Sequence, residues 1–149
     1  MGIVHAYGEF PDNFPIPLRT LVVDDSVVLL ENLCTFLKSK PLFHVFGTAA
    51  NGSEALRMAE LHEPDLVLMD LNMPVMDGLE ATAILRHRLP GVRIIIMTMD
   101  HSAKATAEAW AHGAHGFIDK QAIMNDLTLI TEVRRAFQLK QTQSQRSSP

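Results

Sequence analysis

The sequence predicts an α/β fold built on a doubly wound parallel sheet of five strands, and three observations predict it. Short β-branched runs alternate along the chain with segments whose apolar residues recur about every 3.6 positions. The stretch from Leu66 to Met69 is apolar at every position, as a strand covered on both faces of a sheet requires. Strand and helix units in strict alternation favour the flavodoxin-like (βα)5 arrangement with strand order 2-1-3-4-5.

The predicted strands are the short runs rich in β-branched and aliphatic residues, at residues 20–24, 43–49, 65–70, 92–98 and 116–118. The predicted helices are the periodic segments that follow them, at residues 26–38, 53–62, 78–89, 102–112 and 122–137. Because each helix separates two strands, every connection is expected to be a crossover between parallel strands.

We expect one domain at residues 18–138, with a leader before it and a tail after it. A chain of 149 residues with 47% hydrophobic content is long enough for one sizeable core. Residues 1–17 contain Pro11, Pro15 and Pro17 without an apolar period, which predicts a disordered or extended leader. Residues 139–149 are almost entirely polar, which predicts a flexible tail.

Composition and charge exclude several classes of function. The formal net charge is −4 without a basic stripe, so we expect no nucleic acid to bind this chain alone. No apolar run approaches the roughly 20 residues that span a bilayer, and the first residues lack the pattern of a signal peptide. We therefore expect no membrane span and a cytoplasmic location. The single cysteine, Cys34, is expected to be buried in the core.

Polar residues stand where three predicted strands end, and a lysine follows the fifth strand. Asp24 and Asp25 follow the first strand, Asp70 ends the third, Thr98 ends the fourth, and Lys120 comes just after the fifth. In an open parallel sheet the carboxyl ends of the strands form the edge at which ligands bind. We therefore expect these side chains to converge there, although they lie far apart in the sequence.

The residue types at this edge indicate phosphoryl chemistry. Three crowded carboxylates repel one another unless a cation joins them, and Mg²⁺ prefers oxygen ligands while leaving positions open for a phosphoryl oxygen. A carboxylate beside such an ion can attack phosphorus and form an acyl phosphate. By residue type, Lys120 can neutralise one phosphoryl oxygen and the Thr98 hydroxyl can donate to another.

Each of these residues alone also has an ordinary structural interpretation. The acidic pair, Asp24 and Asp25, could cap the helix that follows, and Asp70 could simply precede a proline-containing turn. Thr98 alone would fit a strand end, and Lys120 alone would fit a solvated surface charge. The joint pattern favours a site, because helix capping does not explain a hydroxyl and a lysine at the ends of other strands.

Seven histidines raise the hypothesis of a zinc site, centred on His112 and His115 with His101 upstream. These residues share no predicted face and have no cysteine beside them, which falls short of a zinc pattern. We expect surface or partly buried imidazoles there.

A family resemblance rests on four stretches: LVVDDS at residues 21–26, DLVLMDLNMPVMDGLEA at 65–81, IIIMTMD at 94–100 and GAHGFIDK at 113–120. Over residues 18–137 the chain resembles the response-regulator receiver domains of two-component signalling. Its motifs most resemble those in the receivers of NarL/LuxR-type regulators, and the resemblance does not extend to their DNA-binding domain.

The resemblance implies a role for each residue at the strand ends. Asp70 is implied as the phosphorylation site, and Mg²⁺ is implied to bind Asp24, Asp25, Asp70 and the backbone carbonyl of Asn72. The same resemblance implies that Thr98 and Lys120 bind the phosphoryl group, and that Thr98 and Phe117 form a switch. The implied reactions are self-catalysed phosphotransfer and dephosphorylation, so we do not expect an enzyme acting on other substrates.

The implied partners are a histidine kinase or phosphotransfer protein as donor, and a downstream protein at the face of the fourth helix, fifth strand and fifth helix. The resemblance leaves open whether the chain forms a homodimer. Two alternatives also stay open: a receiver fragment of a LuxR-type transcription regulator, and a phosphate sink. An Asp-dependent phosphatase or phosphomutase would carry a second acidic residue where Asn72 stands, which argues against that class.

Overall fold

The computed structural model describes Phe10 and residues 14–147, with side chains up to Gln138. Its sheet contains five parallel strands in the order β2-β1-β3-β4-β5, which confirms the predicted fold class. The strands are β1 (Leu18–Val23), β2 (Phe43–Ala49), β3 (Leu66–Asp70), β4 (Arg93–Thr98) and β5 (Gly116–Asp119). The helices are α2 (Val27–Lys38), α3 (Gly52–His62), α4 (Gly78–Arg88), α5 (Ala103–Ala111) and α6 (Asp126–Ser147).

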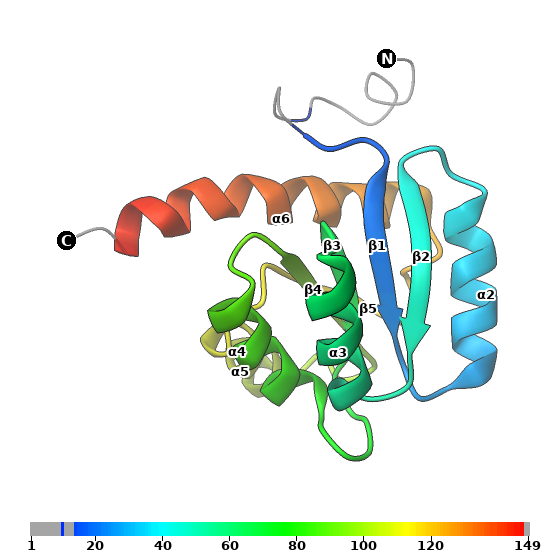
Figure 1. The fold of residues 1–149 in the computed structure, drawn as a ribbon, viewed down its shortest axis with the longest axis horizontal. Helices are drawn as coiled ribbons and strands as arrows, with labels where there is room; N and C mark the ends of the chain where they lie inside the picture. The colour runs from blue at the N-terminus through cyan, green and yellow to red at the C-terminus, as the bar shows by residue number, and fades with distance from the viewer. Residues whose placement is uncertain (1–9, 11–13, 148–149) are drawn as a thin grey trace.

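Helices cover both faces of the sheet (Figure 1), and a hydrophobic core lies on each face. One core joins alternate strand residues such as Val67 and Ile94 to α3, α4 and α5. The other joins the intervening residues, such as Leu68 and Ile95, to α2 and α6. All five residues of β3 are buried, as expected for the central strand of a sheet covered on both faces.

Four helices begin at side-chain caps that the sequence places at the carboxyl edge of the sheet. Ser26, Asn51, Asp77 and Ser102 each accept the backbone N–H of the residue three positions further on. Such caps satisfy N–H groups that have no partner within the helix. The beginnings of α2, α3, α4 and α5 are thereby fixed next to the strand ends.

The predicted bounds of the last helix were wrong at both ends. Residues 121–124 form a turn, and α6 begins after Asn125, whose side chain accepts the N–H of Thr128 at 3.0 Å. At the other end the backbone is helical to Ser147, beyond the predicted end at residue 137. The polar residues there include Gln, Lys and Arg, which are good helix formers, so polarity alone does not end a helix.

Part of the predicted leader packs on the domain. The rings of Phe10 and Phe14 lie 4.2 Å apart between centroids, and Phe14 lies 4.8 Å from the ring of Phe137 on α6. The guanidinium of Arg93 lies over the Phe137 ring, 5.2 Å from its centroid. Residues 1–9, 11–13 and 148–149 of the predicted leader and tail lie outside the described residues, and the division at residues 18 and 138 stays a prediction.

Cys34 differs from the prediction of full burial, because its side chain is only half-buried against the second core. Burial raises the pKa of the Cys34 thiol, while the nearby Lys38 acts to lower it. Within the described part of the chain, no helix is long and apolar enough to cross a membrane.

Candidate functional site

The strand register brings the predicted site residues to one edge of the sheet. Val23 pairs with Met69 between β1 and β3, so Asp24 and Asp70 both follow a paired position. Asp70 in turn pairs with Met97 on β4, directly before Thr98. Thr98 pairs with Asp119 on β5, directly before Lys120. The predicted convergence at the carboxyl edge is therefore present in the structure.

Three carboxylates form a compact acidic cluster at this edge. One oxygen from each of Asp24, Asp25 and Asp70 lies within 4.8 Å of the other two. Asp24 and Asp70 are buried, whereas Asp25 is exposed. Asp24 accepts the N–H of Ser26 at 2.8 Å, but the cap of α2 is the Ser26 side chain itself. Capping therefore does not account for the acidic pair.

Lys120 joins two of these carboxylates. Its Nζ lies 2.7 Å from Asp24 Oδ2 and 2.8 Å from Asp70 Oδ1. The backbone holds the lysine in place, because the N–H of Lys120 donates to the carbonyl of Thr98 at 2.9 Å. Lys120 is thus a half-buried ammonium group directed at the acidic cluster, and not the solvated surface charge that the residue alone would fit.

The electrostatics of the cluster favour an additional cation. Burial is the main reason that the pKa of Asp70 is raised above its ordinary value of 3.8, and the charges of Asp24 and Asp25 raise it further, against the lowering effect of Lys120. Burial acts to lower the pKa of Lys120, but its contacts with Asp24 and Asp70 raise that pKa above 10.5 overall. The single ammonium thus leaves uncompensated negative charge among hard oxygen ligands, a donor set that fits Mg²⁺.

Thr98 lies buried at the end of β4 beside the cluster. Its Oγ1 accepts the N–H of Asp100 at 2.9 Å, while the Asp100 carboxylate accepts the N–H of Ser102 at 2.9 Å. The hydrogen bonds from Ser102 lower the pKa of the Asp100 carboxyl. Asp100 was not predicted from the sequence. It stands two residues after the threonine that ends β4 and two before the serine that caps α5, and this position could have indicated a positioning role.

A cavity of about 340 Å³ opens at the acidic cluster. Asp70, Thr98 and Lys120 line it together with Asn72 and the exposed side chain of Met99. Asn72 therefore stands at the cavity, as predicted for a residue that supplies a carbonyl ligand, and that ligand role stays a prediction.

Phe117 lies on β5, which is the edge strand of the sheet. The residue after it pairs with Met97 on β4. The ring of Phe117 is half-buried and packs against the core formed by α3, α4 and α5. The residue is thus close to the strand end that carries Thr98, as a switch pair requires, and its switching role stays a prediction.

The histidines do not form a metal site in the described residues, where the acidic cluster is the group of side chains close enough to hold an ion. His115 is fully buried, which corrects the expectation of a surface or partly buried ring. Its Nδ1 accepts the N–H of Ile94 at 3.1 Å, so it has a structural role beside β4. His101 lies 3.2 Å from Asp119 instead of facing the other histidines.

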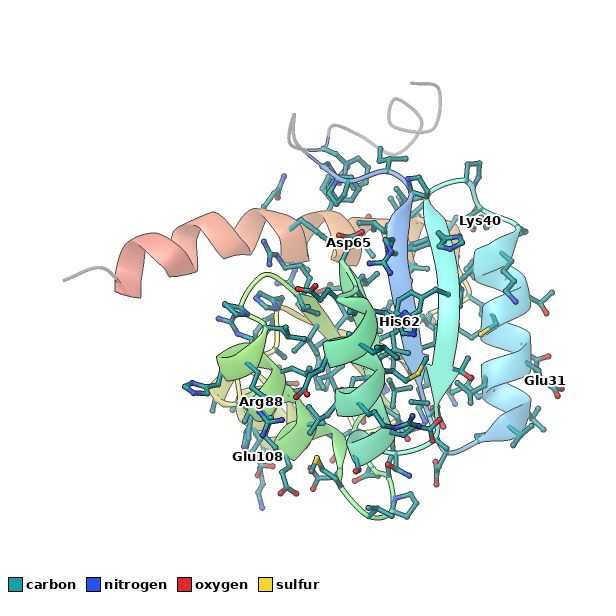
Figure 2. All side chains as sticks on the ribbon, in the orientation of Figure 1. Glu31, Lys40, His62, Asp65, Arg88 and Glu108 are labelled. Atoms are coloured by element: carbon teal, nitrogen blue, oxygen red, sulfur yellow. The ribbon has the colours of Figure 1, made fainter. Side chains whose placement is uncertain are left out.

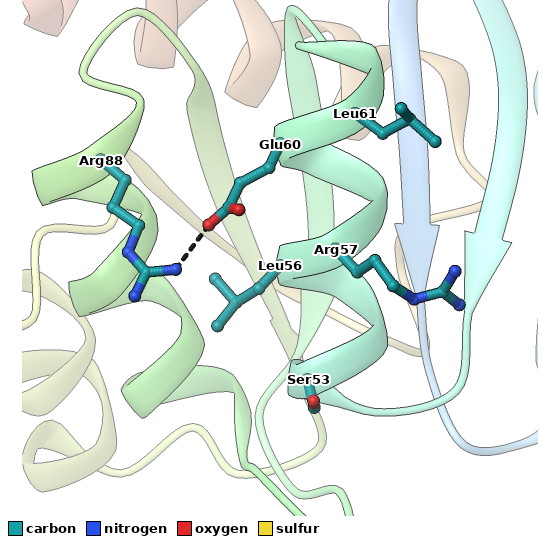
Figure 3. A pocket seen from close by; sticks show the side chains of 6 residues that line it. All are labelled: Ser53, Leu56, Arg57, Glu60, Leu61 and Arg88. Atoms are coloured by element: carbon teal, nitrogen blue, oxygen red, sulfur yellow. Dashed lines mark hydrogen bonds and ion pairs between the residues drawn. The ribbon is translucent and has the colours of Figure 1, made fainter.

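A second, larger hollow lies between α3 and α4, with a volume of about 500 Å³ (Figure 3). Its main charged groups, Glu60 and Arg88, form an ion pair at 2.5 Å with each other. Because these groups neutralise one another and no buried functional side chain points into this hollow, we assign the site to the acidic cavity.

Comparisons with known proteins identify the family of this chain. The family model described as the response regulator receiver domain matches residues 20–132. The transcriptional regulatory protein LnrK of Bacillus subtilis is 36% identical over 103 residues, which is 69% of this chain and 47% of that protein. This chain spans about half or less of the length of the curated relatives that it matches.

Solved structures show the same likeness. The receiver domain of a response regulator named NarL from Mycobacterium tuberculosis aligns with a TM-score of 0.72 and 28% identity, over 78% of this chain and 94% of that one. A chain of the CheX–CheY complex with BeF3 and Mg²⁺ from Borrelia burgdorferi aligns with a TM-score of 0.69 and 26% identity, over 82% and 95%. With its five-stranded sheet, its acidic cluster and a family match over most of its length, this chain belongs to the response regulator receiver domain family.

Proposed function

We propose that this chain accepts a phosphoryl group on Asp70 and thereby switches a surface that binds another protein. The observation that carries this proposal is the position of Asp70, which lies on the central strand between two acidic side chains and the Lys120 ammonium group. Receiver domains act between kinases and downstream proteins, and the family match supports the same role here.

In the proposed reaction a carboxylate oxygen of Asp70 attacks phosphorus and forms a new P–O bond. The bond between phosphorus and the donor breaks, and its electron pair leaves with the donor, a histidine nitrogen in a histidine kinase or phosphotransfer protein. Positioning and charge neutralisation supply most of the catalysis in such transfers. Water later attacks the phosphorus of the acyl phosphate, the P–O bond to Asp70 breaks, and inorganic phosphate leaves while the free carboxylate is restored.

Asp24, Asp25 and Asp70 are the residues that would hold Mg²⁺, together with the backbone carbonyl of Asn72. Bound there, Mg²⁺ neutralises negative charge on the carboxylates and the incoming phosphoryl oxygens. The raised pKa of Asp70 supports this assignment. Burial and the charges of Asp24 and Asp25 raise it by more than the Lys120 ammonium lowers it, so a further positive charge would stabilise the carboxylate. The complex with BeF3 and Mg²⁺ from Borrelia burgdorferi supports it as a likeness.

Lys120 and Thr98 are proposed to bind the phosphoryl group. The Lys120 ammonium, already 2.8 Å from Asp70, would pair with one phosphoryl oxygen. The Thr98 hydroxyl would donate to another. Thr98 Oγ1 now accepts the N–H of Asp100, so a movement of the Thr98 side chain toward the phosphoryl group would change the loop before α5. The space that this movement leaves is proposed to admit the ring of Phe117.

The surface proposed to respond consists of α5, β5 and α6, which are the fourth helix, fifth strand and fifth helix of the receiver. A downstream protein, or a second copy of this chain, would bind there. A kinase donor is consistent with a cytoplasmic location, and the acidic charge balance gives no reason to expect nucleic acid on this chain alone.

A second candidate function is that of the receiver portion of a LuxR-type transcription regulator. The likeness to a transcriptional regulatory protein and to a nitrate/nitrite response regulator, of each of which this chain spans about half, supports that candidate. A phosphate sink is the third, and it differs from the others because phosphorylation would then leave the surface of α5, β5 and α6 unchanged.

Mass spectrometry after incubation with acetyl phosphate and Mg²⁺ tests the proposal. We expect a single phosphoryl adduct on Asp70 that Asp70→Asn abolishes. An undiminished adduct on the Asp70→Asn variant, or an adduct mapped to another aspartate, would contradict the assignment. Profiling phosphotransfer from purified histidine kinases then identifies the donor, because the cognate kinase transfers fastest.

A further inference from the structure

The free edge of the sheet at β5 is covered by a group of side chains that the site does not use. Glu132 and Arg135 extend from α6, and Trp110 extends from α5. These two helices belong to the cores on opposite faces of the sheet, so the three side chains meet around the edge of β5. We call Trp110, Glu132 and Arg135 the edge clamp.

Glu132 is the centre of the edge clamp. Its Oε1 accepts the backbone N–H of Phe117 at 3.4 Å and also pairs closely with Arg135. Glu132 can lie against the strand because Gly116 has no side chain, since a Cβ there would come within 3.0 Å of the same Oε1. With a side-chain exposure of 16%, Glu132 is largely removed from water, which strengthens both contacts.

Arg135 connects this carboxylate to the other face of the sheet. Its guanidinium lies over the Trp110 ring, 5.4 Å from the ring centroid, as in a cation–π contact. A continuous chain of contacts therefore runs from the backbone of Phe117 through Glu132 and Arg135 to Trp110. Phe117 is the residue whose ring is proposed to move when Asp70 is phosphorylated.

We propose that the edge clamp transmits the packing state of Phe117 to the spacing between α5 and α6. This inference rests on the proposed function. A displacement of β5 at Phe117 weakens the bond to Glu132, which releases Arg135 from its fixed position and changes its contact with Trp110. Phosphorylation can shift such an element only through contacts that differ between its two states, and the clamp supplies those contacts at the surface where a partner would bind.

The sequence contains one tryptophan, so the fluorescence of Trp110 reports the clamp directly. In the full chain we expect beryllofluoride with Mg²⁺, used as a phosphoryl mimic, to shift the emission maximum of Trp110. Binding of the mimic is measured separately as a rise in the unfolding temperature that Asp70→Asn removes. In Glu132→Gln and in Arg135→Gln, we expect the mimic still to bind while the emission shift is lost.

A matched control is Glu31→Gln, since Glu31 is exposed on the outer side of α2 and points away from the protein (Figure 2). This variant should keep both the thermal shift and the emission shift. A second readout is the amide NMR signal of Phe117, which should move in Glu132→Gln without any mimic present and stay in place in Glu31→Gln.

The outcomes separate the two proposals. A thermal shift without any change in Trp110 emission in the wild type would overturn the edge clamp and leave the proposed function standing. An emission shift of wild-type size in Glu132→Gln and Arg135→Gln would overturn it as well. Absence of any thermal shift in the wild type would overturn the proposed function, and the coupling that depends on it.

Discussion

Gly78, the first residue of α4, lies so close to Asp70 that a Cβ added to it would come within 2.0 Å of the Asp70 carbonyl oxygen. The N–H of Gly78 also donates to the carbonyl of Leu71 at 3.0 Å. The start of α4 is therefore packed directly against the backbone of the residue proposed to be phosphorylated.

This contact predicts that Gly78→Ala destabilises the protein. Because the obstacle is backbone, relief requires α4 or β3 to move, and we expect a loss of about 3 kcal/mol in the free energy of unfolding. Gly91→Ala is the control, since nothing lies within 4 Å of its added Cβ; it should change that free energy by less than about 0.5 kcal/mol. Urea denaturation measures both, and equal stability of the two variants would contradict the prediction.

Val75 adopts a left-handed backbone conformation, with φ of 69°, in the loop after Asp70. This conformation is costly for a β-branched residue, and the Val75 side chain is 84% exposed, so packing does not offset the cost. We expect Val75→Gly to stabilise the protein by about 1 kcal/mol. The same substitution at exposed Val28, in the first turn of α2, should instead destabilise it by about 0.5 kcal/mol. A loss of stability in Val75→Gly would contradict the strain argument.

The raised pKa of Asp70 predicts a pH-dependent effect of Asp70→Asn. A carboxyl whose pKa is higher in the folded than in the unfolded protein lowers stability as pH rises from the unfolded value of 3.8 through the folded value. We therefore expect Asp70→Asn to be more stable than the wild type at pH 7, and this gain to vanish as pH falls below 3.8. Urea denaturation from pH 3 to pH 7 measures it, and a constant difference at every pH would count against the argument.

Mg²⁺ should raise the unfolding temperature of the wild type, because an ion that binds only the folded protein stabilises it by about 2.7 kcal/mol at 100 times its dissociation constant. Asp25→Ala should remove most of this effect, and because Asp25 is exposed the variant should fold normally without Mg²⁺. Differential scanning calorimetry provides the measurement. A full Mg²⁺ effect in Asp25→Ala would exclude this carboxylate as a ligand.

The arrangement of strands and the residues of the acidic cluster could be predicted from the sequence, because both follow from patterns that are local in the chain. Strand β3 is apolar throughout, and Asp70 marks its end. The turn before α6 could not be predicted in this way, since the apolar residues Ala122 and Ile123 fit a helical period although the Asn125 cap starts the helix later.

Contacts between segments far apart in the chain also could not be predicted from sequence patterns. The packing of Phe14 on Phe137, with Phe10 against Phe14, joins the leader to the last helix, and no periodicity in the leader indicates it. The edge clamp has the same character, because Trp110 on α5 becomes a neighbour of Glu132 and Arg135 on α6 only when the strand between the two helices is an edge strand.

The three carboxylates of the acidic cluster and the Lys120 ammonium stand at or just after the carboxyl ends of strands, and the connections at the opposite edge of the sheet contribute none of them. The exposed turn at Pro90 and Gly91, between α4 and β4, lies at that opposite edge. A peptide inserted at this turn, or new chain termini created there by circular permutation, should leave the ion-binding chemistry intact. The edge of the sheet opposite the acidic cluster is therefore the place to alter the chain without changing the residues of the site.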